Sequence, residues 1–168
     1  MINKRDVTEY ECSNWGNQYP VCEPTSKDTW YQGSDYKFIW NYNNPYYIIN
    51  TPVENNSLDF HLYHLENFAY KHIREWNNLP LLTGSLEVNV NNTWFPKPAP
   101  ENKNETWQMF GWFLPAGSNA TQMLTATDST YPRPFNWSVV RKYIYRFIHL
   151  FRFIEMKRER ERWTNIYV

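Results

Sequence analysis

Gly84-Ser85-Leu86-Glu87-Val88-Asn89-Val90 is the stretch of this 168-residue chain that best indicates its fold class. Its apolar side chains at positions 86, 88 and 90 alternate with the polar side chains at 87 and 89. This period of two is typical of a β-strand with one buried face. In residues 35–41 the rings of Tyr36, Phe38 and Trp40 alternate in the same way. Both stretches therefore predict strands.

Further strand-like runs surround these two stretches, with turn residues between them. We expect strands at 58–63, 70–76, 106–114 and 121–127 in addition to the two above. Aromatic residues, which pack well on a pleated surface, make up 19% of the chain, and the chain has only 5 glycines. The pattern predicts an all-β fold, an antiparallel β-sandwich over residues 30–137. Residues 1–29 read as an irregular lead-in that contains both cysteines.

The apolar period changes after the predicted sandwich. From residue 139 to 162, apolar residues follow the i, i+3, i+4 spacing of an amphipathic helix, with Phe147 and Phe151 on the apolar stripe. Lys142, Arg146 and Arg152 lie off it. We expect residues 138–168 to form a basic amphipathic helix and tail. This helix would pack on its own domain, in the groove of a partner, or on a membrane surface.

The charges are divided along the chain. The whole chain carries 17 basic and 17 acidic residues, a balance that argues against a nucleic-acid partner. Residues 1–140 carry 9 basic and 14 acidic residues, a net charge of −5, whereas residues 141–168 carry 8 and 3, a net charge of +5. The protein is therefore expected to have an acidic body and a short basic tail.

Cys12 and Cys22 are the only two cysteines. Their even count and close spacing favour a disulfide over two free thiols, and the closed loop would stabilise the fold by roughly 2–3 kcal/mol. A structural zinc site is disfavoured at this point of the chain, because two cysteines without a nearby histidine do not supply four ligands.

Five Asn-x-Ser/Thr triplets are possible sites of N-glycosylation. They begin at Asn55, Asn91, Asn104, Asn119 and Asn136. Together with the cysteine pair they favour the lumen of the secretory pathway, the endoplasmic reticulum or Golgi. The first ten residues contain no apolar run of the kind found in signal peptides, which points the other way. The alternatives are a cytosolic or organellar chain and a sequence that begins after a processed segment.

The spacing of five residues over positions 22–40 resembles a known family. Cys22, Pro24, Trp30, Tyr36 and Trp40 form the pattern C-x-P-x5-W-x5-Y-x3-W. It is similar to the start of the luminal domain in a fungal family of single-pass secretory-pathway membrane proteins, the family of the Golgi protein that stabilises the plasma-membrane proton ATPase. Cys12 fits the preceding cysteine of that pattern. The alternative is that the tryptophans are core residues of an unrelated sheet protein.

The resemblance implies a luminal immunoglobulin-like β-sandwich that helps to fold, stabilise or escort a membrane-protein client. It also implies a signal peptide before the domain and a membrane span after it. The chain departs from this pattern where the span is expected, because residues 139–156 contain Arg141, Lys142, Arg146 and Arg152. Each such charge would cost roughly 2.5–3.5 kcal/mol at a bilayer centre. We therefore expect no span in this segment.

No catalytic motif is recognisable, and we expect neither an enzyme nor a cofactor. His61 and His64, three residues apart on a predicted strand, should face opposite sides and cannot share a metal. His72 lies on another predicted strand and could meet one of them, but a solvated or core histidine is the simpler interpretation. Asp59 and Glu87 are outward-facing carboxylates, which only conjecture would pair for glycoside hydrolysis.

Three functions remain at the level of sequence. The first is the non-enzymatic luminal accessory protein described above. The second is carbohydrate binding by exposed rings, for which the candidates are Trp94, Trp107, Trp112 and the Tyr46-Tyr47 pair. The third is a structural subunit of a larger membrane or organellar complex, held through the basic helix.

Overall fold

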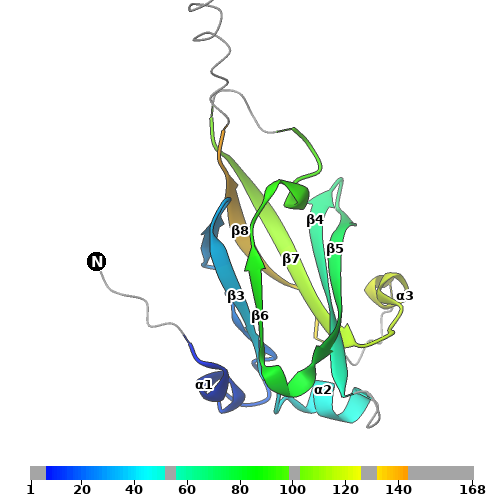
Figure 1. The fold of residues 1–168 in the computed structure, drawn as a ribbon. Coiled ribbons are helices and arrows are strands. Elements are labelled where there is room, and N and C mark those ends of the chain that lie inside the picture. Colours follow the sequence, from blue (N-terminus) through cyan, green and yellow to red (C-terminus); the bar gives the residue numbers. More distant parts are fainter. Residues whose placement is uncertain (1–6, 52–55, 99–102, 126–131, 144–168) are drawn as a thin grey trace, which may run out of the picture.

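The computed structural model describes residues 7–51, 56–98, 103–125 and 132–143. These residues form eight strands in two sheets (Figure 1). The strands are β1 Val21–Glu23, β2 Thr29–Tyr31, β3 Asp35–Trp40, β4 Ser57–Glu66, β5 Ala69–Pro80, β6 Ser85–Asn89, β7 Glu105–Pro115 and β8 Phe135–Arg141. The fold is therefore mostly β, as the sequence predicts.

Short helices connect or precede the strands. They are α1 Glu9–Ser13, α2 Pro45–Asn50, α3 Ala120–Thr125 and the 3-10 turns η1 Leu81–Thr83 and η2 Asn92–Trp94. None of the described helices has the length and apolar character needed to cross a bilayer. α1 and α2 lie at the same end of the molecule (Figure 1).

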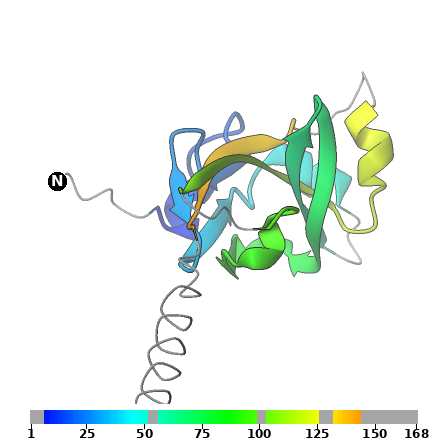
Figure 2. The ribbon, with the colours of Figure 1, turned by 90° about the horizontal axis from the view of Figure 1, so that it is seen from above.

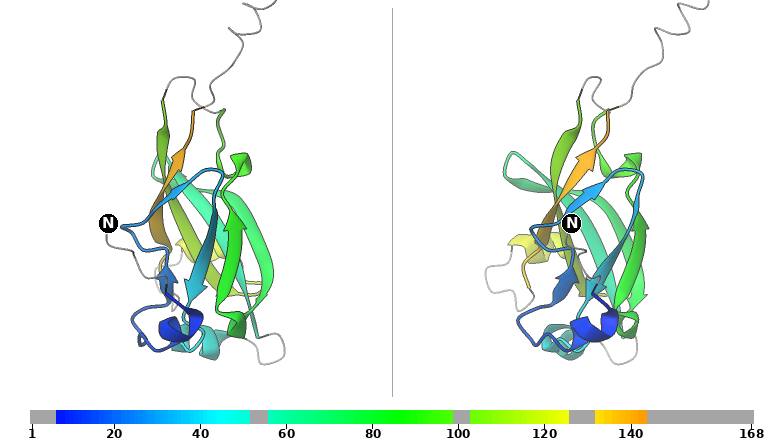
Figure 3. Two further views of the ribbon diagram at one scale, coloured as in Figure 1. Left: turned by 60° about the vertical axis from the view of Figure 1, so that its left-hand side comes forward. Right: turned by 90° about the vertical axis from the view of Figure 1, so that its left-hand side faces the viewer.

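The chain crosses between the two sheets several times, and among the described strands only β4–β5 and β7–β8 are neighbours in sequence that pair with each other. One sheet has the order β1-β3-β6, and the other has the order β2-β8-β7-β4-β5. All pairings are antiparallel except that of β2 with β8, which is parallel. Because β1 and β2 join different sheets, the short segment 24–28 carries the chain from one sheet to the other. Figures 2 and 3 show the two layers from above and from the side.

An aromatic core fills the space between the two sheets. Phe38 of β3 lies with its ring centroid 4.4 Å from that of Phe60 in β4 and 5.2 Å from that of Trp137 in β8. Trp40 packs 4.9 Å from Phe113 of β7 and is fully buried. Burying such rings is a large apolar contribution to stability. The inward faces of residues 35–41 and 84–90 are thus those that the alternation predicts.

The predicted strand at 121–127 is wrong. Residues 120–125 form α3 instead, and the Asn119 side chain accepts a hydrogen bond from the Gln122 backbone at 3.1 Å, as a helix-capping residue does. Met123 and Leu124 pack against a second apolar cluster on the outer face of the larger sheet. Adjacent apolar residues at these positions suit one face of a helix, whereas a strand would have split them between two faces.

The predicted helix does not begin at residue 139. Residues 135–141 form β8, in which the side chains at 137, 139 and 141 are buried. Val139 pairs with Trp107, and Val140 pairs with Thr106. The adjacent valines favour a strand because branching at Cβ suits extended backbone. Lys142 directly follows β8 and is exposed, whereas Arg146, Phe147, Phe151 and Arg152 lie outside the described residues.

The lead-in at 1–29 is not irregular throughout. It contains α1, β1 and the first residue of β2. α1 begins with a capping box, in which Thr8 and Glu11 each accept a hydrogen bond from the other's backbone N–H. The Thr-x-x-Glu spacing that produces this cap is present in the sequence, so the helix start was recognisable.

Candidate functional site

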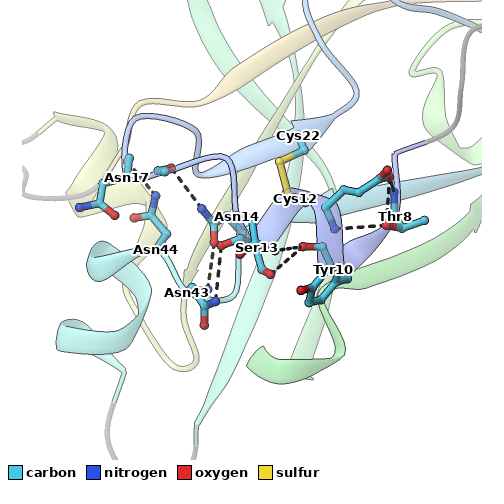
Figure 4. The surroundings of a disulfide bond; sticks show 12 residues. Thr8, Tyr10, Cys12, Ser13, Asn14, Asn17, Cys22, Asn43 and Asn44 are labelled. Atoms are coloured by element: carbon cyan, nitrogen blue, oxygen red, sulfur yellow. Dashed lines mark hydrogen bonds between the residues drawn. A yellow bond between two sulfur atoms is a disulfide. The ribbon is translucent and has the colours of Figure 1, made fainter.

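The disulfide that the sequence predicts is present. Cys12 of α1 is bonded to Cys22 of β1, with their Cα atoms 5.8 Å apart (Figure 4). Both cysteines are buried and pack with Ile39 in a small apolar cluster. The bond closes the loop 13–21 against the three-stranded sheet. The loop is thus anchored at both ends.

Three asparagine side chains hold the same loop from the other side. Asn41 donates to the carbonyl of Gly16 at 3.2 Å, Asn43 to Ser13 at 3.4 Å, and Asn44 to Asn17 at 2.9 Å. Figure 4 shows the side chains of Asn43 and Asn44 directed at the loop. The side chains of Asn41 and Asn44 are buried, so their hydrogen bonds are costly to break. The loop therefore has a fixed position next to the chain that enters α2.

Asn44, the N-cap residue of α2, links the loop to α2 itself. The Oδ1 atom of Asn44 accepts a hydrogen bond from the Tyr46 backbone at 3.1 Å and caps α2. Tyr47 on the inner side of α2 is buried, which raises the pKa of its hydroxyl well above the usual range. Tyr47 and Tyr19 also line one small pocket of about 150 Å³. The loop and α2 thus form one rigid unit.

This unit exposes large apolar side chains to solvent. Five of them are 41–77% exposed, and we call them the apolar end: Trp15, Tyr19, Tyr46, Ile48 and Ile49. The rings of Trp15 and Tyr19 contact each other edge to face at 5.9 Å. Single exposed apolar residues are common, but several on one braced unit are typical of an interaction site. Because the loop and α2 are already held in place, little conformational entropy would be lost when a partner binds to them.

The sequence does not reveal the apolar end as a site. Of its members only Tyr46 is among the rings predicted to bind sugars, as half of the Tyr46-Tyr47 pair. The other half, Tyr47, faces inward. Residues 13–21 looked like a polar loop because breakers and polar residues surround the two rings. No sequence signal shows that three later asparagines hold this loop next to α2.

Of the other three rings proposed for sugar stacking, two are buried and one is half-buried. Trp94 is fully buried and Trp112 is 2% exposed. Trp107 is half-buried between the rings of His64 and Phe95. The expectation of an exposed ring is therefore wrong for Trp94 and Trp112. Rings of this size help to fill the interior of a small β protein.

The residues of the 22–40 spacing lie in the interior. Pro24 and Trp30 are buried, and Tyr36 stacks on Trp30 with ring centroids 4.5 Å apart. Trp40 donates from its indole nitrogen to the carbonyl of Leu81 at 2.8 Å. The spacing thus describes how the first strands pack. It does not describe an exposed site.

The two conjectured catalytic carboxylates, Asp59 and Glu87, lie on different sheets and have different contacts. Asp59 in β4 is buried and accepts hydrogen bonds from the backbones of Asn78 at 2.8 Å and Gly117 at 2.7 Å. Glu87 belongs to the other sheet, where it lies 3.5 Å from the amine of Lys37. Asp59 thus joins two turns, and no acid pair is formed.

The histidines separate as their spacing predicts. His64 packs its ring 5.6 Å from that of Trp107, a residue that contacts the core between the sheets. His61 lies on the other face of β4, 5.9 Å from the ring of His72. Burial lowers the pKa of both His61 and His64. His72 could have lain close to either His61 or His64, and in the structure it lies close to His61.

The five possible glycosylation sites differ in their surroundings. Asn104 and Asn119 are exposed outside strands, and Asn91 is half-buried at the start of η2. Asn136 lies inside β8 opposite Phe110, and its side-chain oxygen accepts from Gln108 at 3.0 Å. Asn55 lies outside the described residues.

If the chain passes through the secretory pathway, we expect glycans at Asn104 and Asn119, and none at Asn136, where a glycan would disturb the ladder. The measurement is mass spectrometry of peptides before and after treatment with peptide N-glycosidase in heavy-oxygen water. Release of a glycan leaves a mass label at its asparagine, so the occupancy of each site is measured separately. Asn104→Gln and Asn119→Gln should each remove one glycan, while Asn136→Gln should leave the mass pattern unchanged. Full occupancy of Asn136 would contradict the expected order of sites.

The disulfide is expected to stabilise the protein by about 2–3 kcal/mol, the value for a loop closed over a sequence separation of 10. The measurement is urea unfolding followed by tryptophan fluorescence, for the oxidised protein and for Cys12→Ser/Cys22→Ser. Dithiothreitol should lower the midpoint of the first protein and leave that of the double variant unchanged. Equal midpoints for the two proteins would show that the docked loop is held by its asparagines alone.

Comparisons with protein-family models, with curated proteins and with solved structures find no match to this chain.

Proposed function

We propose that the protein is a non-enzymatic accessory protein of the secretory-pathway lumen that binds a membrane-protein client through the apolar end. The observation that carries this proposal is the rigid exposure of Trp15, Tyr19, Tyr46, Ile48 and Ile49 by a disulfide-closed loop and a capped helix. Tryptophan and tyrosine supply much of the binding energy at protein interfaces. The disulfide and the Asn-x-Ser/Thr triplets support a luminal setting.

An immunoglobulin-like sandwich is the fold that we infer for this module. The sheet β1-β3-β6 corresponds to strands A, B and E of such domains, and β8-β7-β4-β5 corresponds to G, F, C and C′. β1 and β2 share the role of the first strand, one on each sheet. Antibody domains join strands B and F by a disulfide, whereas here the rings of Trp40 and Phe113 meet between the corresponding strands β3 and β7. This architecture is widely used for binding, which agrees with the proposed role.

The alternatives of the sequence analysis have less support. Carbohydrate binding relied on exposed rings, and the tryptophans named for it are buried or half-buried. A structural subunit would also use an apolar surface, and its association would be permanent and stoichiometric. The experiment below therefore measures both the identity of the partner and its stoichiometry.

The test is photo-crosslinking from position 49. A benzoylphenylalanine placed at Ile49 should form an adduct with an integral membrane protein in the cells that make this chain. The matched control is the same residue at Leu65, which is 42% exposed on β4, away from the apolar end. We expect an adduct from position 49, and none from position 65.

The paired variant Ile48→Asp/Ile49→Asp should weaken client binding roughly 30-fold or more, as expected when interface side chains of this class are lost. Both side chains are more than half exposed, so the melting temperature should stay the same. A drop in the client's steady-state level would support the accessory role. Adducts with soluble proteins only, or a constant one-to-one complex in which the client level is unaffected, would overturn it.

A further inference from the structure

The outer face of the larger sheet brings two histidines and a glutamate together. The ligand atoms of His61, His72 and Glu75 all lie within 4.8 Å of one another. His61 belongs to β4, and the other two belong to β5. The cluster lies on the larger sheet, whereas the apolar end is built on α2 and the disulfide loop.

An irregularity in the β4–β5 ladder explains how His72 and Glu75 come to share a face. Residues three apart on a regular strand point to opposite sides. Here Leu62 pairs with Arg74 and Tyr63 pairs with His72, so Ile73 is an extra residue in β5. An extra residue of this kind rotates the side chains that follow it. Ile73 turns inward against the core, and His72 and Glu75 both turn outward toward His61.

The distances between the polar atoms are those of groups that face one another without a hydrogen bond. Nδ1 of His61 lies 3.6 Å from Oε2 of Glu75, and Nε2 of His72 lies 3.9 Å from the same oxygen. A hydrogen bond would draw such atoms to about 2.7–3.2 Å. Two ligands on a tetrahedral zinc ion, each about 2.0–2.1 Å from the metal, lie roughly 3.3 Å apart. The two distances to Glu75 are within a few tenths of an ångström of this zinc geometry. The three ligand atoms as a set lie within 4.8 Å of one another, so a bound ion would also draw the two imidazoles closer together.

The surroundings favour a bound cation. His61 is buried, and its Nδ1 atom is the ring nitrogen that faces Glu75. His72 and Glu75 keep 45% and 48% of their side-chain surface exposed, so an ion can enter from solvent. The ring of Tyr63 lies beside both histidines, 6.3 Å from the ring of His61 and edge to face at 5.4 Å from that of His72. One buried ligand and two ligands that solvent can reach thus face one another on the same side of the hairpin.

We propose that His61, His72 and Glu75 bind one zinc ion, with water in the remaining position. Two imidazoles and one carboxylate form a donor set that zinc prefers, and such a set leaves one position open. The ion would link β4 to β5, the edge strand of this sheet. This site is independent of the proposed function, because it requires no client.

The experiment is a zinc titration of the intact, untagged protein by isothermal calorimetry. We expect about one equivalent of zinc to bind with a dissociation constant tighter than about 100 µM. His72→Ala and Glu75→Gln should each weaken binding at least ~10-fold. Both side chains are about half exposed, so neither change should impair folding. Glu66→Gln, at the end of the same hairpin, is the matched control and should bind as the unchanged protein does.

The imidazole resonances of the protein give a second measurement. On adding zinc, those of His61 and His72 should shift, while those of His64 on the opposite face of β4 should stay in place. Absence of binding up to ~100 µM zinc would overturn the proposal. So would binding that His72→Ala leaves unchanged, because the ion would then be held elsewhere.

Discussion

Gly111→Val is expected to destabilise the protein by about 3 kcal/mol or more, the upper range for forcing extra atoms into a packed core. A Cβ atom at Gly111 of β7 would lie 2.4 Å from Cζ of Phe135 and 2.8 Å from Cε2 of Phe60. Non-bonded carbons pack at about 3.5–4.0 Å. Neither ring can move away easily, because both pack against Phe113, with Phe60 tilted at 4.6 Å and Phe135 stacked at 6.0 Å between ring centroids. The measurement is urea unfolding followed by tryptophan fluorescence.

Two further variants show whether this crowding is the cause. Thr106→Val lies on the exposed side of the same strand and should change the free energy of unfolding by less than about 0.5 kcal/mol. Phe135→Ala added to Gly111→Val removes two of the three close contacts. The double variant should therefore be more stable than the sum of the single effects indicates. Strict additivity would show that the ring of Phe135 is not what limits the space at Gly111.

Trp40→Ala is the second substitution with a large expected effect, about 3–5 kcal/mol, as for other buried aromatic truncations. The fully buried ring packs on Phe113, and its Nε1–H group satisfies the carbonyl of Leu81. The variant loses the apolar contact and one of the two hydrogen bonds that the Leu81 carbonyl accepts, the other coming from the Gly84 backbone. Thermal unfolding should show a drop in melting temperature of about 10 °C.

Graded controls separate the two parts of this loss. Trp40→Phe keeps most of the apolar volume and loses the donor, so it should cost about 1–3 kcal/mol. Trp15→Ala removes a ring of the apolar end and should stay within about 0.5 kcal/mol of the unchanged protein. If Trp40→Phe were as damaging as Trp40→Ala, the hydrogen bond to Leu81 would be the dominant contribution. If Trp15→Ala were equally damaging, the apolar end would belong to the folding core.

Local pattern predicts the strands of this chain well where alternation is strong. Residues 35–41 and 84–90 each have one apolar face and one polar face, and each forms a strand. It fails where short segments carry mixed signals. Residues 120–125 contain few residues that distinguish a helix from a strand, and contact with the second apolar cluster decides for the helix. At β8, residues 137, 139 and 141 alternate as in a strand. The helical spacing of apolar residues over 139–162 begins within this strand and led to the prediction of a helix there.

The candidate sites depend on contacts between distant segments, which a local pattern does not contain. The apolar end exists because Asn41, Asn43 and Asn44 hold a loop that begins about thirty residues earlier. The histidine cluster exists because Ile73 is an extra residue in its ladder. The spacing showed that His61 and His64 face apart, and it could not place Glu75 beside His61. The disulfide was predictable, because only two cysteines exist and they are close in sequence.

The position of β8 also determines how the module would respond to mechanical tension on the chain beyond it. β8 lies between β2, to which it is parallel, and β7, to which it is antiparallel. A pull on residue 143 acts along β8, so the hydrogen bonds on both flanks are sheared together and do not open one at a time. The resistance of such an arrangement is set by the rate of forced unfolding. We therefore expect β8 to resist a pull along its axis more than a strand paired on one flank only would.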